Sequence, residues 1–239
     1  MAKPTAPGLL PSTSNRILRL LHAGDRAQLE EMGRRSSVTQ GDVLQETGEP
    51  IEKIYFPLSG VLSLMAVLST GQSAEVASIG REGFAGLPVF LGAKIASTQT
   101  LVQVAGECIE LDANHFRKEM SSGGRLAIIL ARYAELLFLS AAQSTACGRL
   151  HTVEERLARA ILTWHDRLDR ETLPVTQDSL AEALGVRRAS VTVAMRTFVD
   201  SGAIRRGRGR IYLTDRKKLE GHSCECYSTI QEAFDREVG

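Results

Sequence analysis

The feature that most constrains the fold is a pair of short helix-forming segments separated by one glycine, within residues 177–196. In the first segment Leu180, Ala181 and Leu184 recur at helical spacing, which gives a short helix one apolar face. Gly185 follows at once, where a sharp turn needs a positive φ or no side chain. Apolar residues also mark the inner face of the second segment: Val186, Val191 and Ala194. This pattern predicts a helix-turn-helix.

The side chains left to project outward from the second segment are polar or basic. They are Arg187, Arg188, Ser190, Thr192 and Arg196. An ordinary packed helix pair shows the same apolar spacing, so the charge that follows decides between the two interpretations. From Arg187 to Lys218 there are ten basic and two acidic residues, a local excess of eight positive charges in a chain of net charge +1. Such asymmetry is typical of a phosphate-binding face and predicts binding to double-stranded DNA.

The residues after the second segment predict a wing. Gly202 ends the helix, and two β-prone runs, 203–206 and 210–213, flank Gly207-Arg208-Gly209. That arrangement predicts a short hairpin beside the helix pair. We expect Arg208 and Arg210 in this hairpin to bind phosphates. Polar side chains at the leading end of a recognition helix enter the major groove, so we expect Arg187, Arg188, Ser190 and Thr192 to contact phosphates or bases.

The first half of the chain has a different pattern of helix-forming, strand-forming and glycine residues. Residues 15–35 predict an amphipathic helical segment that is interrupted at 23–25. From about 38 to 112, glycines punctuate short β-prone runs: 43–44, 54–56, 61–67, 74–79, 100–104 and 108–111. Turn glycines between short strands favour an antiparallel β-roll over a parallel sheet with crossover helices. With the helical second half, the fold class is α+β.

A long helix is expected from about Arg125 to Arg149. Its near-heptad positions are Leu126, Ile129, Tyr133, Leu136 or Leu137, Ser140, Ser144 and Cys147. Such a stripe can bury against its own domain or against a second copy of itself, and its apolar character favours a homodimer. Thr152 and Glu155 then form a capping-box pattern that opens another helix. An amphipathic segment follows at 215–236.

These segments divide the chain into four parts. They are a mobile tail (1–14), a β-roll sensor domain with flanking helices (15–122), a dimerisation helix (123–150) and a winged-helix DNA-binding domain (151–239). The sequence has no run of about eighteen apolar residues and no secretory signal, so we expect no membrane association. Its four cysteines have no framework spacing, which fits a reducing cytoplasm.

Several stretches resemble the cyclic-AMP receptor / fumarate-nitrate regulator (Crp/Fnr) family of bacterial transcription factors. They include YFPLSG at 55–60, SIGREGFAG at 78–86, TVEERLARAIL at 152–162, VTQDSLAEALGVRRASVT at 175–192 and GAIRRGRGRIYL at 202–213. The resemblance covers about residues 16–214. It implies a β-roll, a long dimerisation helix and a winged helix, a dimer on a two-fold symmetric DNA site, and RNA polymerase as a further candidate partner.

The likeness stops at the ligand-binding segment. Cyclic-AMP binders of the family have a Glu shortly after the glycine of this segment and an Arg further on. Here no acid follows Gly83 or Gly86, the Arg position falls near Gln99, and residues 83–100 contain no Arg. A cyclic phosphate needs cations or charge-assisted donors, so we do not expect cyclic AMP to be the effector. The effector pocket is predicted from Gly83, Phe84, Gly86, Leu87, Gln99, Thr100 and Tyr133, and its ligand is unknown.

Sequence patterns for other functions are weaker. The iron-sulfur branch of the family uses an N-terminal cysteine cluster, whereas the first cysteine here is Cys108, so no such cluster is expected. His222, Cys224 and Cys226 could supply three soft metal ligands, but structural zinc takes four in most cases, and we expect no metal. Thiol redox sensing by the pair is a subsidiary hypothesis. Residues 38–112 have no His, which argues against a cupin-type enzyme. A sensing module that acts through protein contacts is the alternative to a DNA-binding regulator.

The second helix also departs from the family pattern. Relatives often have Arg, then Glu, then a second Arg on this helix. Arg188 matches the first of these positions, which implies that it reads a base, but Ala189 and Val193 occupy the other two. Arg187 stands where the family usually has a capping Ser. The resemblance therefore implies a target sequence that differs from the best-known sites.

Overall fold

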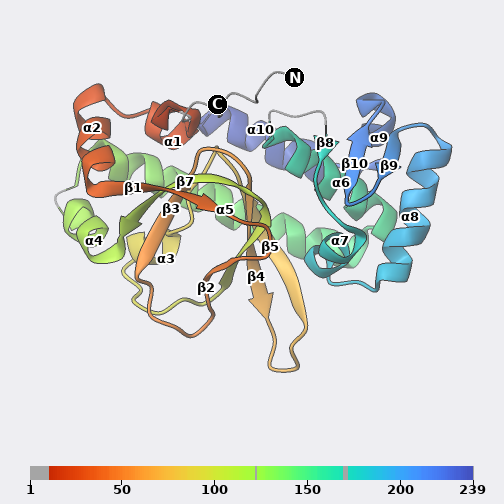
Figure 1. Ribbon diagram of the computed structural model, residues 1–239, viewed down its shortest axis with the longest axis horizontal. Helices are drawn as coiled ribbons and strands as arrows, with labels where there is room; N and C mark the ends of the chain where they lie inside the picture. The colour runs from red at the N-terminus through yellow and green to blue at the C-terminus, as the bar shows by residue number, and fades with distance from the viewer. Residues whose placement is uncertain (1–10, 122, 169–171, 239) are drawn as a thin grey trace, which may run out of the picture.

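The computed structural model describes residues 11–121, 123–168 and 172–238. A β-roll occupies one end of the molecule, a winged helix the other, and one long helix runs behind both (Figure 1). Residues 1–10 of the expected tail lie outside the described residues. A 3₁₀ helix at Ser12–Ser14 begins the folded part, with Ser12 buried, so the last residues assigned to a mobile tail belong to the packed structure.

The β-roll consists of two antiparallel sheets with strand orders β1-β7-β3 and β2-β6-β4-β5. Its strands are β1 (Gly33–Val38), β2 (Val43–Gln45), β3 (Lys53–Pro57), β4 (Val61–Val67), β5 (Ser73–Ile79), β6 (Gln99–Val104) and β7 (Gly106–Asp112). Its helices are α1 (Arg16–Arg19), α2 (Ala23–Met32), α3 (Leu87–Phe90) and α4 (Ala113–Ser121). Residues 33–35, expected at the end of a helix, instead pair with β7, because tertiary pairing overrides the weak local preference.

Gly60 shows why glycine is needed at one of the turns in this roll. Its φ is +82°, a region that other residues rarely adopt. A Cβ at this position would lie only 2.6 Å from the carbonyl oxygen of Val104 in β6. The turn into β4 therefore needs glycine both for its backbone conformation and for the close approach of a neighbouring strand.

The long helix α5 (Arg125–Leu150) carries its apolar stripe toward its own domain. The buried stripe residues are Leu126, Ile129, Tyr133, Leu136, Leu137, Ser140 and Cys147, and the first five lie in the core that the helix shares with the β-roll and α10 (Cys226–Val238). The assignment of this stripe to a dimer interface is therefore wrong. By length and composition α5 is the one described helix that could cross a membrane, but its inner face packs into this core.

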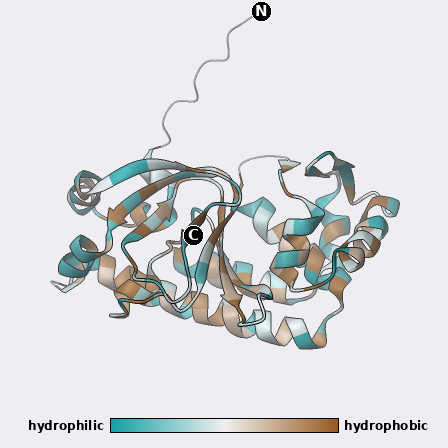
Figure 2. Ribbon diagram, turned by 60° about the horizontal axis from the view of Figure 1, so that its bottom comes forward, coloured by the Kyte–Doolittle hydropathy of each residue, from teal (hydrophilic) through white to brown (hydrophobic). Residues whose placement is uncertain are grey.

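The opposite face of α5 is exposed and also follows a seven-residue spacing. Ile128 and Phe138 are 60% and 76% exposed, and Ala131, Ala142 and Thr145 continue the row. The exposed Glu135 occupies the remaining position of this spacing, between Ala131 and Phe138. Figure 2 shows hydrophobic residues along the first half of this helix. The helix thus has two apolar faces, and only one of them is covered within the chain.

The winged helix follows α5 directly. It consists of α6 (Val153–Asp166), β8 (Thr172–Leu173), α7 (Gln177–Leu184), α8 (Arg188–Asp200), β9 (Ile204–Gly207), β10 (Arg210–Leu213) and α9 (Arg216–His222), with sheet order β8-β10-β9. The predicted capping box is present, since Glu155 N–H donates to Thr152 Oγ1 and Thr152 N–H donates to Glu155 Oε2. Thr176 likewise caps α7.

The two halves share one packed seam. Val61 and Val104 of the β-roll belong to the same buried cluster as Trp164 and the other core residues of the winged helix. Arg167, at the end of α6, is buried and places Nε 2.6 Å from Glu82 Oε1 of the sensor half. It also donates a hydrogen bond to the hydroxyl of Ser78. The seam is therefore both apolar and ionic.

Candidate nucleic-acid interface and sensor cavity

The helix-turn-helix forms as predicted, and its turn depends on Gly185. This residue ends α7 with φ +62° and ψ +37°, the left-handed conformation that favours glycine. α8 then begins at Arg188, with Val191, Ala194, Met195 and Phe198 buried beneath it. This apolar underside fixes the direction of the helix and leaves its first turn in solvent.

The predicted contact residues lie on the outer face of α8. Arg187, Arg188, Thr192 and Arg196 are exposed, and Ser190 is partly exposed. Arg188 Nη1 lies 3.2 Å from Asp178 Oδ2 in the first turn of α7. Thr192 Oγ1 donates to Gln177 Oε1 at 3.0 Å. α7 thus holds the side chains of two of the predicted contact residues in place.

Two apolar residues share this exposed face and were not among the predicted contacts. Val193 is 71% exposed, and Ala189, one turn earlier, is exposed as well. Small apolar side chains on a recognition helix can contact the thymine methyl group in the major groove. Their spacing of four residues on the charged face was the sequence signal that could have identified them.

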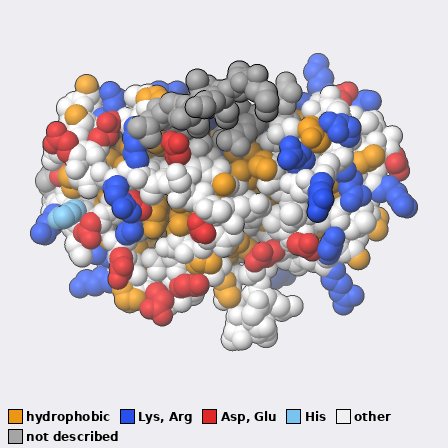
Figure 3. All heavy atoms as spheres, in the orientation of Figure 1, with side chains coloured by type: hydrophobic (Ala, Val, Ile, Leu, Met, Phe, Trp, Pro, Cys, Tyr) orange, Lys and Arg blue, Asp and Glu red, His pale blue; other side chains and the backbone are white. Residues whose placement is uncertain are grey.

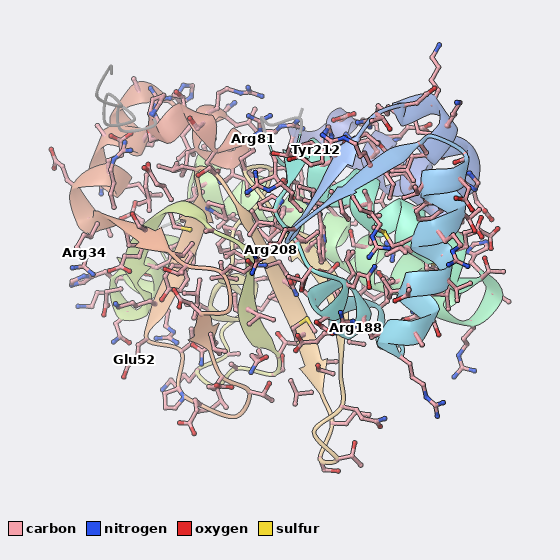
Figure 4. The ribbon with its side chains drawn as sticks, turned by 45° about the vertical axis from the view of Figure 1, so that its right-hand side comes forward. Arg34, Glu52, Arg81, Arg188, Arg208 and Tyr212 are labelled. Atoms are coloured by element: carbon pink, nitrogen blue, oxygen red, sulfur yellow. The ribbon has the colours of Figure 1, made fainter. Side chains whose placement is uncertain are left out.

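The wing supplies a second set of cations. Arg208 and Arg210 are exposed at its tip, where Gly209 adopts φ +68°. In β9, the Arg205 guanidinium lies 3.7 Å from the centroid of the Tyr212 ring, a cation–π contact that stiffens the hairpin. Basic side chains gather at the winged-helix end of the molecule (Figure 3). Figure 4 shows Arg188 at the start of α8 and Arg208 at the wing tip.

A cavity of about 470 Å³ lies in the β-roll beside α5. Of the seven predicted pocket residues, four line it: Phe84, Gly86, Leu87 and Thr100. Most of the other lining side chains are apolar, among them Leu64, Ile79, Leu91 and Phe138. Of the described residues that line the cavity, Lys53 alone carries a charge, and its Nζ lies 3.4 Å from Glu110 Oε1. The cavity therefore has the chemistry of an apolar binding site.

The other three predicted pocket residues lie outside this lining. Tyr133 is fully buried, with its ring 5.5 Å from Phe84 and 6.3 Å from Phe234, and burial raises the pKa of its phenol. Gly83 packs against it so closely that a Cβ would lie 2.2 Å from the Tyr133 oxygen. Gln99 instead donates from Nε2 to Glu46 Oε2 at 2.9 Å. Core packing sets the positions of Gly83 and Tyr133, and a hydrogen bond to Glu46 sets that of Gln99; local sequence reveals neither.

The C-terminal cysteines are not grouped with His222. Nδ1 of His222 lies 3.0 Å from Glu154 Oε1, and its ring packs on Phe198 at 5.2 Å. The buried cysteines Cys224 and Cys226 instead meet Cys147 from the end of α5. The hydrogen bond between Cys224 and Cys147 lowers the pKa of the Cys147 thiol to about 5 and raises that of Cys224.

Family models match both halves of the chain. Residues 35–122 match the cyclic nucleotide-binding domain, and residues 155–221 match the Crp-like helix-turn-helix domain. A comparison with curated protein sequences gives no match.

Solved structures share the fold. FixK2 from Bradyrhizobium japonicum is 17% identical, with 80% of this chain and 98% of that chain covered and a TM-score of 0.69. The c-di-GMP-responsive global regulator CLP of Xanthomonas campestris is 14% identical over 80% and 99%, with a TM-score of 0.66. TTHA1359, a CRP/FNR-family transcriptional regulator from Thermus thermophilus, is 24% identical over 82% and 98%, with a TM-score of 0.61. From the order of the two matched domains and the shared fold, the chain belongs to the Crp/Fnr family of transcription regulators.

Proposed function

We propose that this protein is a cytoplasmic, homodimeric transcription regulator that reads a two-fold symmetric DNA site through α8. The observation that carries the proposal is the set of exposed cations on one domain, at the first turn of α8 and at the tip of the wing. An apolar underside fixes the helix, while the side chains at its leading end are free to enter the major groove. RNA polymerase is a further partner of such a regulator.

The contacts divide by position. Arg188 at the start of α8 reads a base edge, and Val193 and Ala189 contact thymine methyl groups on the same face. Arg187, Ser190, Thr192 and Arg196 contact phosphates or neighbouring bases. Arg208 and Arg210 in the wing contact phosphates and carry no sequence information.

An electrophoretic shift assay on genomic fragments at several salt concentrations tests this function. We expect selected fragments to bind, and the logarithm of the affinity to fall linearly with the logarithm of the salt concentration as counterions are released. Absence of any shift, for free protein and for protein supplied with cell extract, would favour the alternative in which the β-roll acts through protein contacts.

The dimer is proposed to form through the outer face of α5. Ile128 and Phe138 are the large apolar side chains of this row. The smaller Ala131, which lies between them, and Ala142, one turn beyond Phe138, allow close approach of a second helix. Two copies joined there present two recognition helices to one DNA duplex.

Substitution of Phe138 tests the dimer. Phe138→Glu places a charge at the centre of the row, and we expect sedimentation to show the mass of one chain where the parent shows two. Leu68→Glu is the matched control, because Leu68 is also a large exposed apolar residue, at 59%, but lies between β4 and β5 and outside this row. If the Phe138→Glu protein sediments with the same mass as the parent dimer, the dimer interface does not lie on the outer face of α5.

The effector is proposed to be an apolar small molecule rather than a cyclic nucleotide. The cavity of about 470 Å³ is of the size that takes such ligands, and Lys53, its one charged lining residue, already faces Glu110. A phosphate there would find no arginine among the described lining residues. Phe138 borders the cavity and lies on the outer row of α5, so a bound ligand would touch the dimer surface directly.

A further inference from the structure

Four metal-binding side chains converge where the end of α5 meets the segment between α9 and α10. They are Cys147, His151, Cys224 and Cys226. Their sulfur and nitrogen atoms all lie within 4.8 Å of one another. We propose that these four side chains bind one Zn²⁺ ion as a closed, tetrahedral Cys₃His site.

Two of the distances between the ligand atoms already match those of a zinc tetrahedron. With Zn–S bonds of about 2.3 Å and Zn–N bonds of about 2.0–2.1 Å, two sulfur ligands lie about 3.8 Å apart, and a sulfur and a nitrogen about 3.6 Å apart. Cys147 Sγ and Cys224 Sγ are separated by 3.5 Å, and Cys226 Sγ and His151 Nδ1 by 3.7 Å. The remaining separations are at most 4.8 Å, so they need to shorten by about 1.2 Å at most to reach these zinc-site distances, and rotation about side-chain bonds provides this.

The histidine has the support that a metal ligand requires. Its Nδ1 faces the sulfurs, and its Nε2 lies 3.3 Å from the carboxylate of Glu225, the residue between the two C-terminal cysteines. A metal-bound histidine commonly donates its second N–H to a carboxylate, which fixes the ring and its tautomer. One short segment, Cys224–Cys226, therefore supplies two ligands and the group that orients a third.

The surroundings suit a zinc–thiolate centre. The three cysteines are each at most 4% exposed and form a buried cluster of their own, outside the two large apolar cores. Three thiolates and a histidine around Zn²⁺ carry one net negative charge. Arg156 and Arg159 of α6 lie close enough to Cys147 to interact with its charge. A disulfide between Cys147 and Cys224 is the alternative interpretation of this cluster, but it would use only two of the four side chains and would not explain why Cys226 and His151 lie beside them.

The ligand set points to one zinc ion and to a structural role. Thiolate and imidazole ligands in a tetrahedral arrangement are typical of zinc, and four protein ligands leave no open position for a substrate. An iron–sulfur cluster would place several iron and sulfide atoms between the ligands, and so would need them farther apart than they are.

The site connects three elements of the fold. It joins the last turn of α5, the connection to α6, and the start of α10, at the point where the long helix passes into the winged helix. Arg156, beside the cluster, donates from Nη2 to the carbonyl oxygen of Leu184 at 2.6 Å, directly before Gly185. Bound zinc would thus hold the helix-turn-helix at a fixed angle to α5. This consequence rests on the proposed function.

Metal content of the full-length protein tests the site. Protein purified under reducing conditions, stripped with a chelator and supplied with Zn²⁺ alone, should retain one zinc per chain after desalting, measured by mass spectrometry of the elements. Co²⁺ in place of Zn²⁺ should give the visible absorption bands of tetrahedral cobalt bound by thiolates. Failure to retain zinc, iron as the retained metal, or a Cys147–Cys224 disulfide in the reduced protein would each overturn the proposal.

Variants separate the ligands from their neighbours. Cys224→Ser and His151→Ala should lose the zinc, while His151→Cys, which keeps four ligands, should retain it. Cys108→Ser and His222→Gln are controls that should retain it too, because these residues lie outside the cluster. Retention of zinc by both Cys224→Ser and His151→Ala, with the parent's circular dichroism, would contradict the site. If a variant does not fold, the cobalt spectrum of the parent still decides.

DNA binding tests the consequence separately. Removal of zinc should weaken DNA binding by roughly tenfold, within the usual range for coupling between two sites, and re-addition should restore it. Unchanged DNA binding with one zinc per chain would contradict the coupling alone. Absence of DNA binding in both forms, with zinc present, would count against the proposed function and not against the metal site.

Discussion

The sensor half and the winged-helix half resemble their family domains in different respects. The β-roll retains the frame of a nucleotide-binding domain, but its cavity is apolar and its one charged lining residue faces an acid. The winged helix retains the layout of the interface itself, with an apolar underside and exposed cations at the leading end of α8. A fold can thus persist while the chemistry inside it changes, so the matched cyclic nucleotide-binding domain does not identify the effector.

The largest expected effect concerns the seam that joins these two halves. Arg167→Ala would leave Glu82 charged and without its partner in a buried site, and removal of one member of such a pair costs about 3–5 kcal/mol. Chemical denaturation should show this loss in one transition for both halves. The double variant Glu82→Leu/Arg167→Met should lose much less, because no lone charge remains.

A surface pair provides the matched control for the seam. Arg34→Ala breaks a pair with Glu110 in which Arg34 is 75% exposed, and we expect a change of less than about 1 kcal/mol. If Arg167→Ala were as mild as Arg34→Ala, or if the two halves unfolded in separate steps, the seam would not hold them together as one unit.

The next effect separates base reading from phosphate binding within the DNA-binding half. Arg188→Ala should cost about 1–3 kcal/mol of discrimination at one base pair. Arg208→Ala should weaken all DNA similarly and lower the slope of the salt dependence by about one. Titrations of both variants against an operator and against random DNA, at several salt concentrations, measure the two effects.

Asp178 adds a control to this pair of variants. Asp178→Asn removes the carboxylate that holds Arg188 in the free protein, so binding should strengthen for operator and random DNA alike. An unchanged ratio of operator to random affinity in Arg188→Ala would show that Arg188 does not read a base.

The smallest effect is expected in the sensor half. Cyclic AMP should stabilise the protein by less than about 0.4 kcal/mol, the value reached when ligand concentration equals Kd. Thermal unfolding with and without the nucleotide measures this, and a lipophilic dye that enters apolar cavities serves as the positive comparison. A clear upward shift of Tm with cyclic AMP would mean that the cavity binds nucleotides despite its apolar lining.

Local patterns explain which parts of the fold could be predicted from the sequence. Strands β2 to β7 of the β-roll, the turn at Gly185, the wing and the Thr152 cap have patterns in residues close together in the chain, and each was predicted. β1 was missed because its pairing with β7 involves partners about 75 residues away. The apolar stripe of α5 was assigned to a dimer interface but packs into the core of its own chain, because periodicity shows that a face is apolar and not what covers it.

The site residues follow the same division. The exposure of the residues on α8 and in the wing could be predicted from sequence, because helical spacing turns the first group outward and the glycine turn of a short hairpin exposes the second. Tyr133 and Gln99 could not, since packing against Phe84 and pairing with Glu46 decide their directions. Only part of the cysteine cluster could be predicted from the sequence. Cys147 and His151 lie one helical turn apart, but their contact with Cys224 depends on how α10 packs along α5.

The seam between the two halves also determines which part of this protein could be transferred to a chimera. Val61 and Val104 complete the core of the winged helix, and a Cβ on Gly185 would lie 3.2 Å from Cβ of Ala74 in the β4–β5 hairpin. The recognition turn is therefore shaped partly by a strand from the other half. A chimera that joins this DNA-binding domain to another sensor must carry the matching hairpin surface with it, so the unit of exchange is larger than either matched domain.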